Sequence, residues 1–88
     1  MITKQLVRNI RSTEFSEIPS EVVIHAKKSL LNWLGVTIGA SYHETIEIAL
    51  KLKDELDSSE QVSIIGRKER ADLLLAVLIN GMSSHIFD

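Results

Sequence analysis

Cysteine is absent from this 88-residue chain, and proline, glycine and aromatic residues are scarce. Without cysteine the chain can form neither a disulfide nor a thiolate metal site. No apolar run reaches the roughly 20 residues that a membrane-spanning helix needs. The first nine residues mix charged with apolar side chains, unlike the continuous apolar core of a signal peptide. These absences argue against a secreted or membrane-spanning protein, and we expect a cytoplasmic one.

Neither sign of charge dominates the chain. Ten Lys and Arg residues are set against twelve Asp and Glu residues, which gives a formal net charge of −2. A protein that binds nucleic acid needs a basic patch to neutralise phosphates, and no such patch is present, so we expect no nucleic-acid partner. A chain this short buries only about 60% of the surface that its unfolded form exposes. One small domain of marginal stability is therefore expected.

Apolar residues recur at helical spacing in four segments, which predicts an all-α fold: a small bundle of about four helices. The first segment carries Ile2, Leu6 and Ile10 on one face and is expected to end near residues 11–13. The last segment, residues 73–79, is apolar on every side, as buried helices are. A bundle of only four short helices cannot surround this segment if each helix also keeps a face in contact with solvent. We therefore expect exposed apolar surface on the isolated chain, and with it oligomerisation or instability.

The second segment is expected to begin at Pro19, because a proline in the first turn loses no hydrogen bond. His25 is expected to be partly buried on this helix, and the alternative is a ligand or a base. Gly35 and Gly39 are typical of close helix packing, or, for Gly39, of a helix end. The helical spacing of its apolar residues makes this the helix expected to build the core: Val22, Val23, Ala26, Leu30, Leu34 and Ile38.

The third helix is expected over about residues 42–56, after a capping box formed by Ser41 and Glu44. Ile46, Ala49 and Leu50 line one side of it. Glu47 and Lys51 are four residues apart and indicate a wetter face. This helix is accordingly expected to be the most exposed of the long ones.

Residues 61–65 form a short β-prone run. A single strand makes no sheet, so we expect an extended connector or an edge that pairs with residues outside the chain. The fourth helix is then expected to begin near Lys68 or Glu69. Asn80 and Gly81 follow its apolar run, where they can either break the helix or orient the chain before the residues that come next.

The familiar catalytic signatures are missing: there is no glycine-rich phosphate loop, no Gly-x-Ser-x-Gly and no His-Glu-x-x-His. The candidate chemistry narrows to His85 and Asp88, which lie three residues apart. On a continuing helix they share a face, near enough for an imidazole and a carboxylate to interact. The alternative is a solvated pair at a chain end. No metal-ligand spacing is present, and no metal is expected.

Three stretches of the sequence form a recognisable pattern, which ends in Asn80-Gly81, His85 and Asp88. Together they resemble the N-terminal part of the MmgE/PrpD family, which includes 2-methylcitrate dehydratase and cis-aconitate decarboxylase. Asn32 departs from the pattern, because the family usually has aspartate there. The first stretch is residues 18–23 followed by 26–36 and 39–41, the second is residues 64–67, and the third, which is the most specific, is residues 76–88.

The resemblance implies that residues 1–88 are the N-terminal portion of the helical domain of a larger protein, without the rest of the catalytic domain and without the lid domain. It implies a cofactor-independent lyase of propionate metabolism, which removes water or carbon dioxide from a small tricarboxylate. A homodimer is also implied.

By the same resemblance, Asp88 matches the first aspartate of the family's catalytic stretch, and His85 matches the neighbouring motif histidine. The threonine and histidine that follow in the family are missing from this sequence. We therefore expect the 88-residue chain alone to be inactive. The alternative is a helical packing or dimerisation module with no site of its own, motivated by the apolar residues 73–79 and the Gly35/Gly39 spacing.

Overall fold

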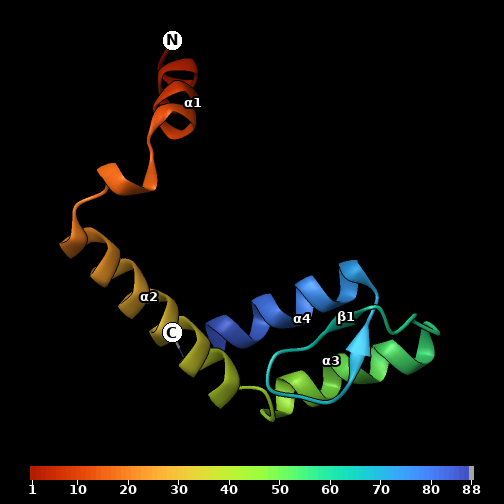
Figure 1. Ribbon diagram of the computed structural model, residues 1–88. Coiled ribbons are helices and arrows are strands. Elements are labelled where there is room, and N and C mark those ends of the chain that lie inside the picture. Colours follow the sequence, from red (N-terminus) through yellow and green to blue (C-terminus); the bar gives the residue numbers. More distant parts are fainter. Residues whose placement is uncertain (88) are drawn as a thin grey trace.

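The computed structural model describes residues 1–87 and contains four α-helices and one two-stranded hairpin (Figure 1). The prediction of an all-α chain of about four helices is confirmed. The helices are α1 (Ile2–Ser12), α2 (Ser20–Gly39), α3 (Glu44–Glu55) and α4 (Leu73–Ile86), with a 3₁₀ turn, η1 (Phe15–Glu17), between the first two. The strands are β1 (Val62–Ser63) and β2 (Arg70–Ala71).

The molecule is elongated. Its radius of gyration is 17.3 Å and its extents are 47 × 26 × 21 Å, whereas a compact chain of this length has a radius of gyration of about 12 Å. Figure 1 shows the reason: α1 and the first half of α2 extend away from the other elements. The chain therefore divides into an arm, residues 1–36, and a packed unit, residues 37–87.

The packed unit contains every buried side chain of the described residues. α4 lies at its centre, in contact with the C-terminal end of α2, with α3 and with both strands. One apolar cluster joins α3, the hairpin and α4, and it consists of Ile46, Ala49, Leu50, Ile64, Ala71, Leu75, Ala76 and Ile79. This cluster, and not α2, is the core of the molecule.

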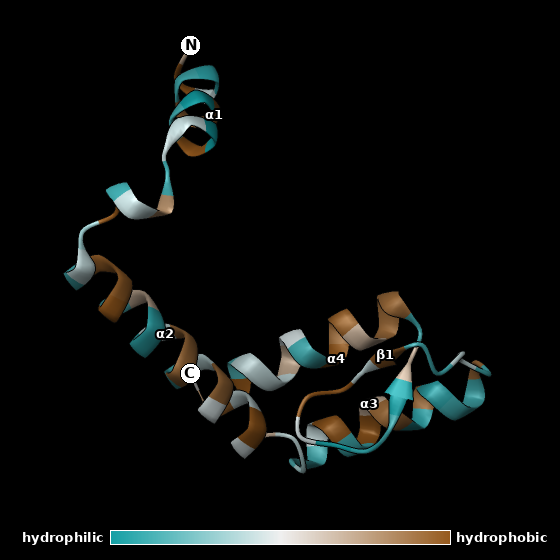
Figure 2. Ribbon diagram, viewed as in Figure 1, coloured by the Kyte–Doolittle hydropathy of each residue, from teal (hydrophilic) through white to brown (hydrophobic). Residues whose placement is uncertain are grey.

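The prediction that α2 builds the core is wrong. Thr37 is its only buried residue, while Val22, Leu30 and Leu34 are exposed. Figure 2 shows apolar segments of α2 that no other described element covers. Helical spacing identified the face that needs a partner, but it carries no information about whether a partner is present. His25, expected to be partly buried, is exposed for the same reason.

The expected Ser41–Glu44 capping box is also wrong. The Ser41 hydroxyl donates to the Ile38 carbonyl at 2.6 Å, so it closes the end of α2 instead. The N-cap of α3 is His43, whose Nδ1 accepts a hydrogen bond from the Thr45 amide at 3.1 Å. α3 is not the most exposed long helix either, because it supplies three buried residues to the core: Ile46, Ala49 and Leu50.

The β-prone run pairs within the chain, contrary to the expectation of a connector or an edge with an outside partner. Val62 lies opposite Ala71 and Ser63 opposite Arg70 in an antiparallel ladder. Gly66 makes the reversal possible, because its φ of +82° lies in the left-handed region that side chains rarely adopt. The partner strand occupies the place where sequence spacing had predicted the start of the fourth helix.

α4 begins at Leu73, several residues later than expected, because Asp72 is its N-cap. Asp72 Oδ1 accepts from the Leu75 amide at 2.9 Å, and the Ser58 hydroxyl donates to Oδ2 at 2.6 Å. Both hydrogen bonds lower the pKa of Asp72, and the one from Ser58 has the larger effect. The negative charge of a capping carboxylate also interacts favourably with the positive end of the helix dipole.

α4 is buried on one face only. Its opposite face is exposed and apolar, which confirms the expectation of uncovered apolar surface: Leu73, Leu74, Val77 and Leu78. A Cβ added at Gly35 would meet no atom within 4 Å, so this glycine makes no close helix contact with the described residues. Gly39 is the last residue of α2, in agreement with the helix-end interpretation.

Candidate functional site at the C-terminal end of α4

Asn80 fixes α4 against the strand that precedes the hairpin turn. Its side-chain oxygen accepts from the Ile65 amide at 2.9 Å, and its Nδ2 donates to the Ser63 carbonyl at 3.2 Å. Asn80 and Gly81 do not break the helix, which continues to Ile86. The two hydrogen bonds orient the last turns of α4, as the second of the two sequence interpretations proposed.

The last turn of α4 meets the C-terminal end of α2. The Phe87 ring contacts the His43 ring edge to face, with centroids 6.2 Å apart and planes at 84°. Phe87 also lies against Gly39, where an added Cβ would come to 3.9 Å from the ring. These contacts hold the end of α4 at the connection between α2 and α3.

His85 lies in this last turn of α4, and it is exposed. A basic side chain at this end complements the helix dipole. Two residues earlier, the Ser83 side chain is buried, and its hydroxyl has no hydrogen-bond partner among the described residues. Asp88 lies outside the described residues, so the predicted pairing of His85 with Asp88 stays a prediction.

Arg67 forms a separate polar cluster, with its side chain only 7% exposed. Its Nη1 donates to Glu47 Oε1 at 2.6 Å and to the Ser41 carbonyl at 3.0 Å. Its Nη2 and Nε both donate to Glu69 Oε2, at 2.6 and 3.1 Å. The guanidinium also stacks on the Tyr42 ring, 4.3 Å from its centroid.

The Arg67 cluster is structural. The hydrogen bond from Arg67 lowers the pKa of Glu69, and the hydrogen bond to Glu69 raises the pKa of Arg67. Two carboxylates and a carbonyl accept hydrogen bonds from the guanidinium, which fixes it between α3 and the hairpin turn. Sequence reasoning missed the cluster, because Glu47 and Arg67 lie 20 residues apart and no local spacing pairs them.

Residues 1–87 contain neither a cluster of metal-ligating side chains nor a helix that could span a membrane. No group of three His, Asp or Glu side chains there could hold a metal ion. None of the helices in that part of the chain combines the length and the apolar character needed to cross a membrane.

The comparison with protein families decides the affiliation. The model of the MmgE/PrpD N-terminal domain matches residues 4–88, almost the whole chain. The chain belongs to the MmgE/PrpD family. Searches among curated proteins and among solved structures gave no significant match. The MmgE/PrpD match spans α2, the hairpin and α4, the elements that carried the resemblance, and it includes both His85 and Asp88.

Proposed function

We propose that this chain provides the N-terminal part of the helical domain of a cofactor-independent MmgE/PrpD lyase that acts on a small tricarboxylate. The family match over residues 4–88 is the observation that supports it. The reaction is loss of water from a 2-methylcitrate-like substrate or loss of carbon dioxide from a cis-aconitate-like one. Either reaction needs a proton-transfer group near the reacting carbon and several groups that bind carboxylates.

His85 and Asp88 are the proposed contribution of this chain to the chemistry. His85 is exposed at the end of a helix that Asn80 and Phe87 hold in place. Asp88 would act as an acid-base group or orient the substrate. Arg67, which is buried, is already bound to Glu47 and Glu69. We propose that the 88-residue chain alone does not turn over.

A chimera tests the proposal. Residues 4–88 would replace the matching segment of an active MmgE/PrpD enzyme, and dehydration of 2-methylcitrate and decarboxylation of cis-aconitate would be assayed. His85→Gln and Asp88→Asn should each lower kcat by roughly 10² or more, as expected for loss of a proton-transfer group. The controls are His25→Gln and Asp54→Asn, at exposed positions on α2 and α3. The purified 88-residue chain should show no turnover, and detectable turnover would contradict that part of the proposal.

The second candidate is a packing module without a site. The uncovered apolar faces of α2 and α4 favour it. In that case the chimera would fold and retain its activity when His85 or Asp88 is replaced. The same kinetic comparison therefore separates the two functions.

A further inference from the structure

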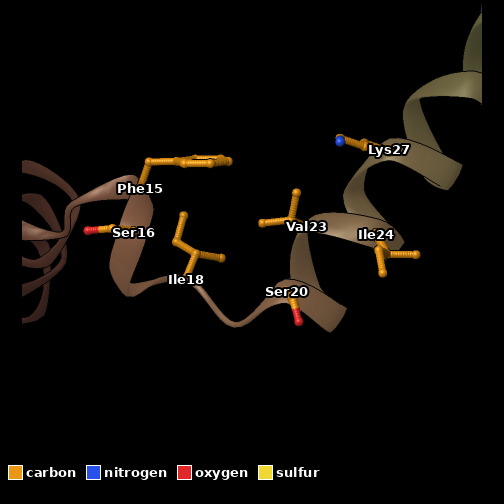
Figure 3. Close-up of a pocket in the computed structure, with 7 residues that line it drawn as sticks. All are labelled: Phe15, Ser16, Ile18, Ser20, Val23, Ile24 and Lys27. Atoms are coloured by element: carbon orange, nitrogen blue, oxygen red, sulfur yellow. The ribbon is translucent and has the colours of Figure 1, made fainter.

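The two phenylalanine side chains of the chain differ in what holds their rings. Phe15, on η1, is 73% exposed and lines an open hollow of the arm, opposite Val23 (Figure 3). Phe87, at the end of α4, is 59% exposed. Its ring nevertheless has two defined neighbours, the His43 ring and Gly39. Specific contacts, and not general burial, therefore place the ring of Phe87.

Phe87 lies where the regular helix hydrogen bonds of α4 end. The last helical residue is Ile86, and Phe87 is the C-cap, whose amide donates to the His85 carbonyl. Phe87 is thus hydrogen-bonded to one candidate site residue. It is also joined by a single peptide bond to the other, Asp88. A displacement of the Phe87 ring would accordingly act on both candidate residues.

His43 gives the Phe87 ring a fixed support. Its backbone amide donates to the Ala40 carbonyl at 2.9 Å, and its carbonyl accepts from the Ile46 amide at 2.9 Å. Its Nδ1 accepts from the Thr45 amide at 3.1 Å, so the imidazole cannot rotate without losing the N-cap of α3. Both the backbone and the ring of His43 are therefore held before Phe87 packs on them.

The geometry of the two rings is that of an attractive pair. A centroid distance of 6.2 Å and an interplanar angle of 84° are typical of edge-to-face aromatic contacts. An added Cβ at Gly39 would lie 3.9 Å from the Phe87 ring, an ordinary van der Waals distance. The ring is thus seated against the end of α2 and the beginning of α3 together.

We propose that His43 and Phe87 are positioning residues for the chemistry of His85 and Asp88. The His43 ring holds the Phe87 ring, and Phe87 sets the placement of the two site residues. The proposal rests on the lyase function proposed above. A misplacement of about 1 Å can lower a rate by about 10². Because neither positioning residue touches the substrate in this arrangement, their loss should lower kcat and leave KM little changed.

Two substitutions at position 43 of the chimera described above separate the helix cap from the ring contact. His43→Asn keeps a side-chain acceptor for the Thr45 amide and removes the aromatic ring. His43→Phe keeps a ring and removes the acceptor. His43→Asn should lower kcat by roughly tenfold or more, with KM and Tm little changed. His43→Phe should keep kcat near the parent value while its Tm falls.

A purely structural role for His43 predicts the opposite order. In that case kcat would follow Tm, and His43→Phe would be the more impaired variant. That order, or an unchanged kcat in His43→Asn, would overturn the proposal. Failure of the lyase function is recognised separately, because His85→Gln and Asp88→Asn would then leave kcat unchanged, and the positioning proposal would fall with it.

Nuclear magnetic resonance of the 88-residue chain adds a readout that does not depend on activity. Nuclear Overhauser effects should connect the ring protons of His43 and Phe87, and His43→Asn identifies the His43 signals among those of the three histidines. Phe87→Leu should shift the His43 ring signals, because it removes the ring current of Phe87. Phe15→Leu, at the open hollow of the arm, is the matched control and should leave them in place. Equal shifts in the two variants, or no Overhauser effect between the rings, would overturn the proposal.

Discussion

The arm and the packed unit have similar apolar patterns, but they differ in whether their side chains are buried. Residues 1–36 include an amphipathic helix and most of a second apolar helix, yet none of them is buried. Residues 37–87 contain all the buried side chains of the described residues. The difference shows that apolar spacing identifies the face of a helix that needs a packing partner. The path of the chain determines whether another element packs on that face.

The path differs because the packed unit reverses direction and the arm does not. The turn around Gly66 returns β2 to β1, and Arg67 then binds the Ser41 carbonyl in the α2–α3 connection and Glu47 in α3. Asn80 ties α4 to the same strand region. In the arm, short extended links join α1, η1 and α2 end to end, so no element returns to cover another (Figure 1).

The largest expected effect comes from truncating one isoleucine in each region. Ile79 is fully buried, whereas Ile24 is 51% exposed. Ile79→Ala should lower the free energy of unfolding by about 2–5 kcal/mol, through lost burial and the cavity left behind. Ile24→Ala should change it by less than about 1 kcal/mol. Urea unfolding followed by circular dichroism gives both values, and equal losses would show that the arm folds with the packed unit.

Local signals in the sequence predicted much of the helical structure. The spacing of Ile2, Leu6 and Ile10 placed α1, and Pro19 marked the start of α2. What could not be predicted depended on contacts between distant residues. The pairing of Val62 with Ala71 is an example: it moved the start of α4, because the residues expected to begin that helix belong to the reversal instead.

The candidate site was predictable only in part, for the same reason. Family resemblance singled out His85, and α4 carries it at an exposed end. The groups that hold that end have no local signature: Asn80 binds the strand region, and Phe87 packs on His43. His43 is also the N-cap of α3. Asp88 lies outside the described residues, so its role remains a prediction.

Gly66 and Gly35 provide a second comparison between the packed unit and the arm. At Gly66, φ is +82° and an added Cβ would lie 2.6 Å from the Ser41 hydroxyl, so Gly66→Ala should destabilise the chain by about 2–3 kcal/mol. Gly35 has open space around it in the helical arm, so Gly35→Ala should instead favour the helix by up to about 1 kcal/mol. Thermal and urea unfolding would measure the two shifts. A loss of stability in Gly35→Ala would reveal a close helix contact at that position.

Replacing Asn80 and Asn32 tests whether side-chain hydrogen bonds stabilise the packed unit. Asn80→Ala removes two hydrogen bonds to the strand region and should lower stability by about 1–2 kcal/mol. Asn32→Ala lies on the exposed part of α2 and should be neutral or slightly stabilising, because alanine favours helix. Amide hydrogen exchange adds a local measurement: Asn80→Ala should increase exchange at Ile65, whose amide donates to Asn80. Unchanged exchange at Ile65 would contradict the role given to Asn80.

The smallest effect concerns pH, and it depends on Glu69. Because the hydrogen bond from Arg67 lowers the pKa of Glu69 in the folded chain, the stability that it contributes is present above the unfolded pKa of about 4.3. That stability is lost as pH falls through the lower pKa of the folded state. Glu69→Gln should therefore be less stable than the parent at neutral pH, and the difference should disappear in acid. Glu21→Gln, on the uncovered arm, is the matched control. A Glu69→Gln difference that stayed constant from neutral to acid pH would mean that the ion pair with Arg67 does not stabilise the packed unit.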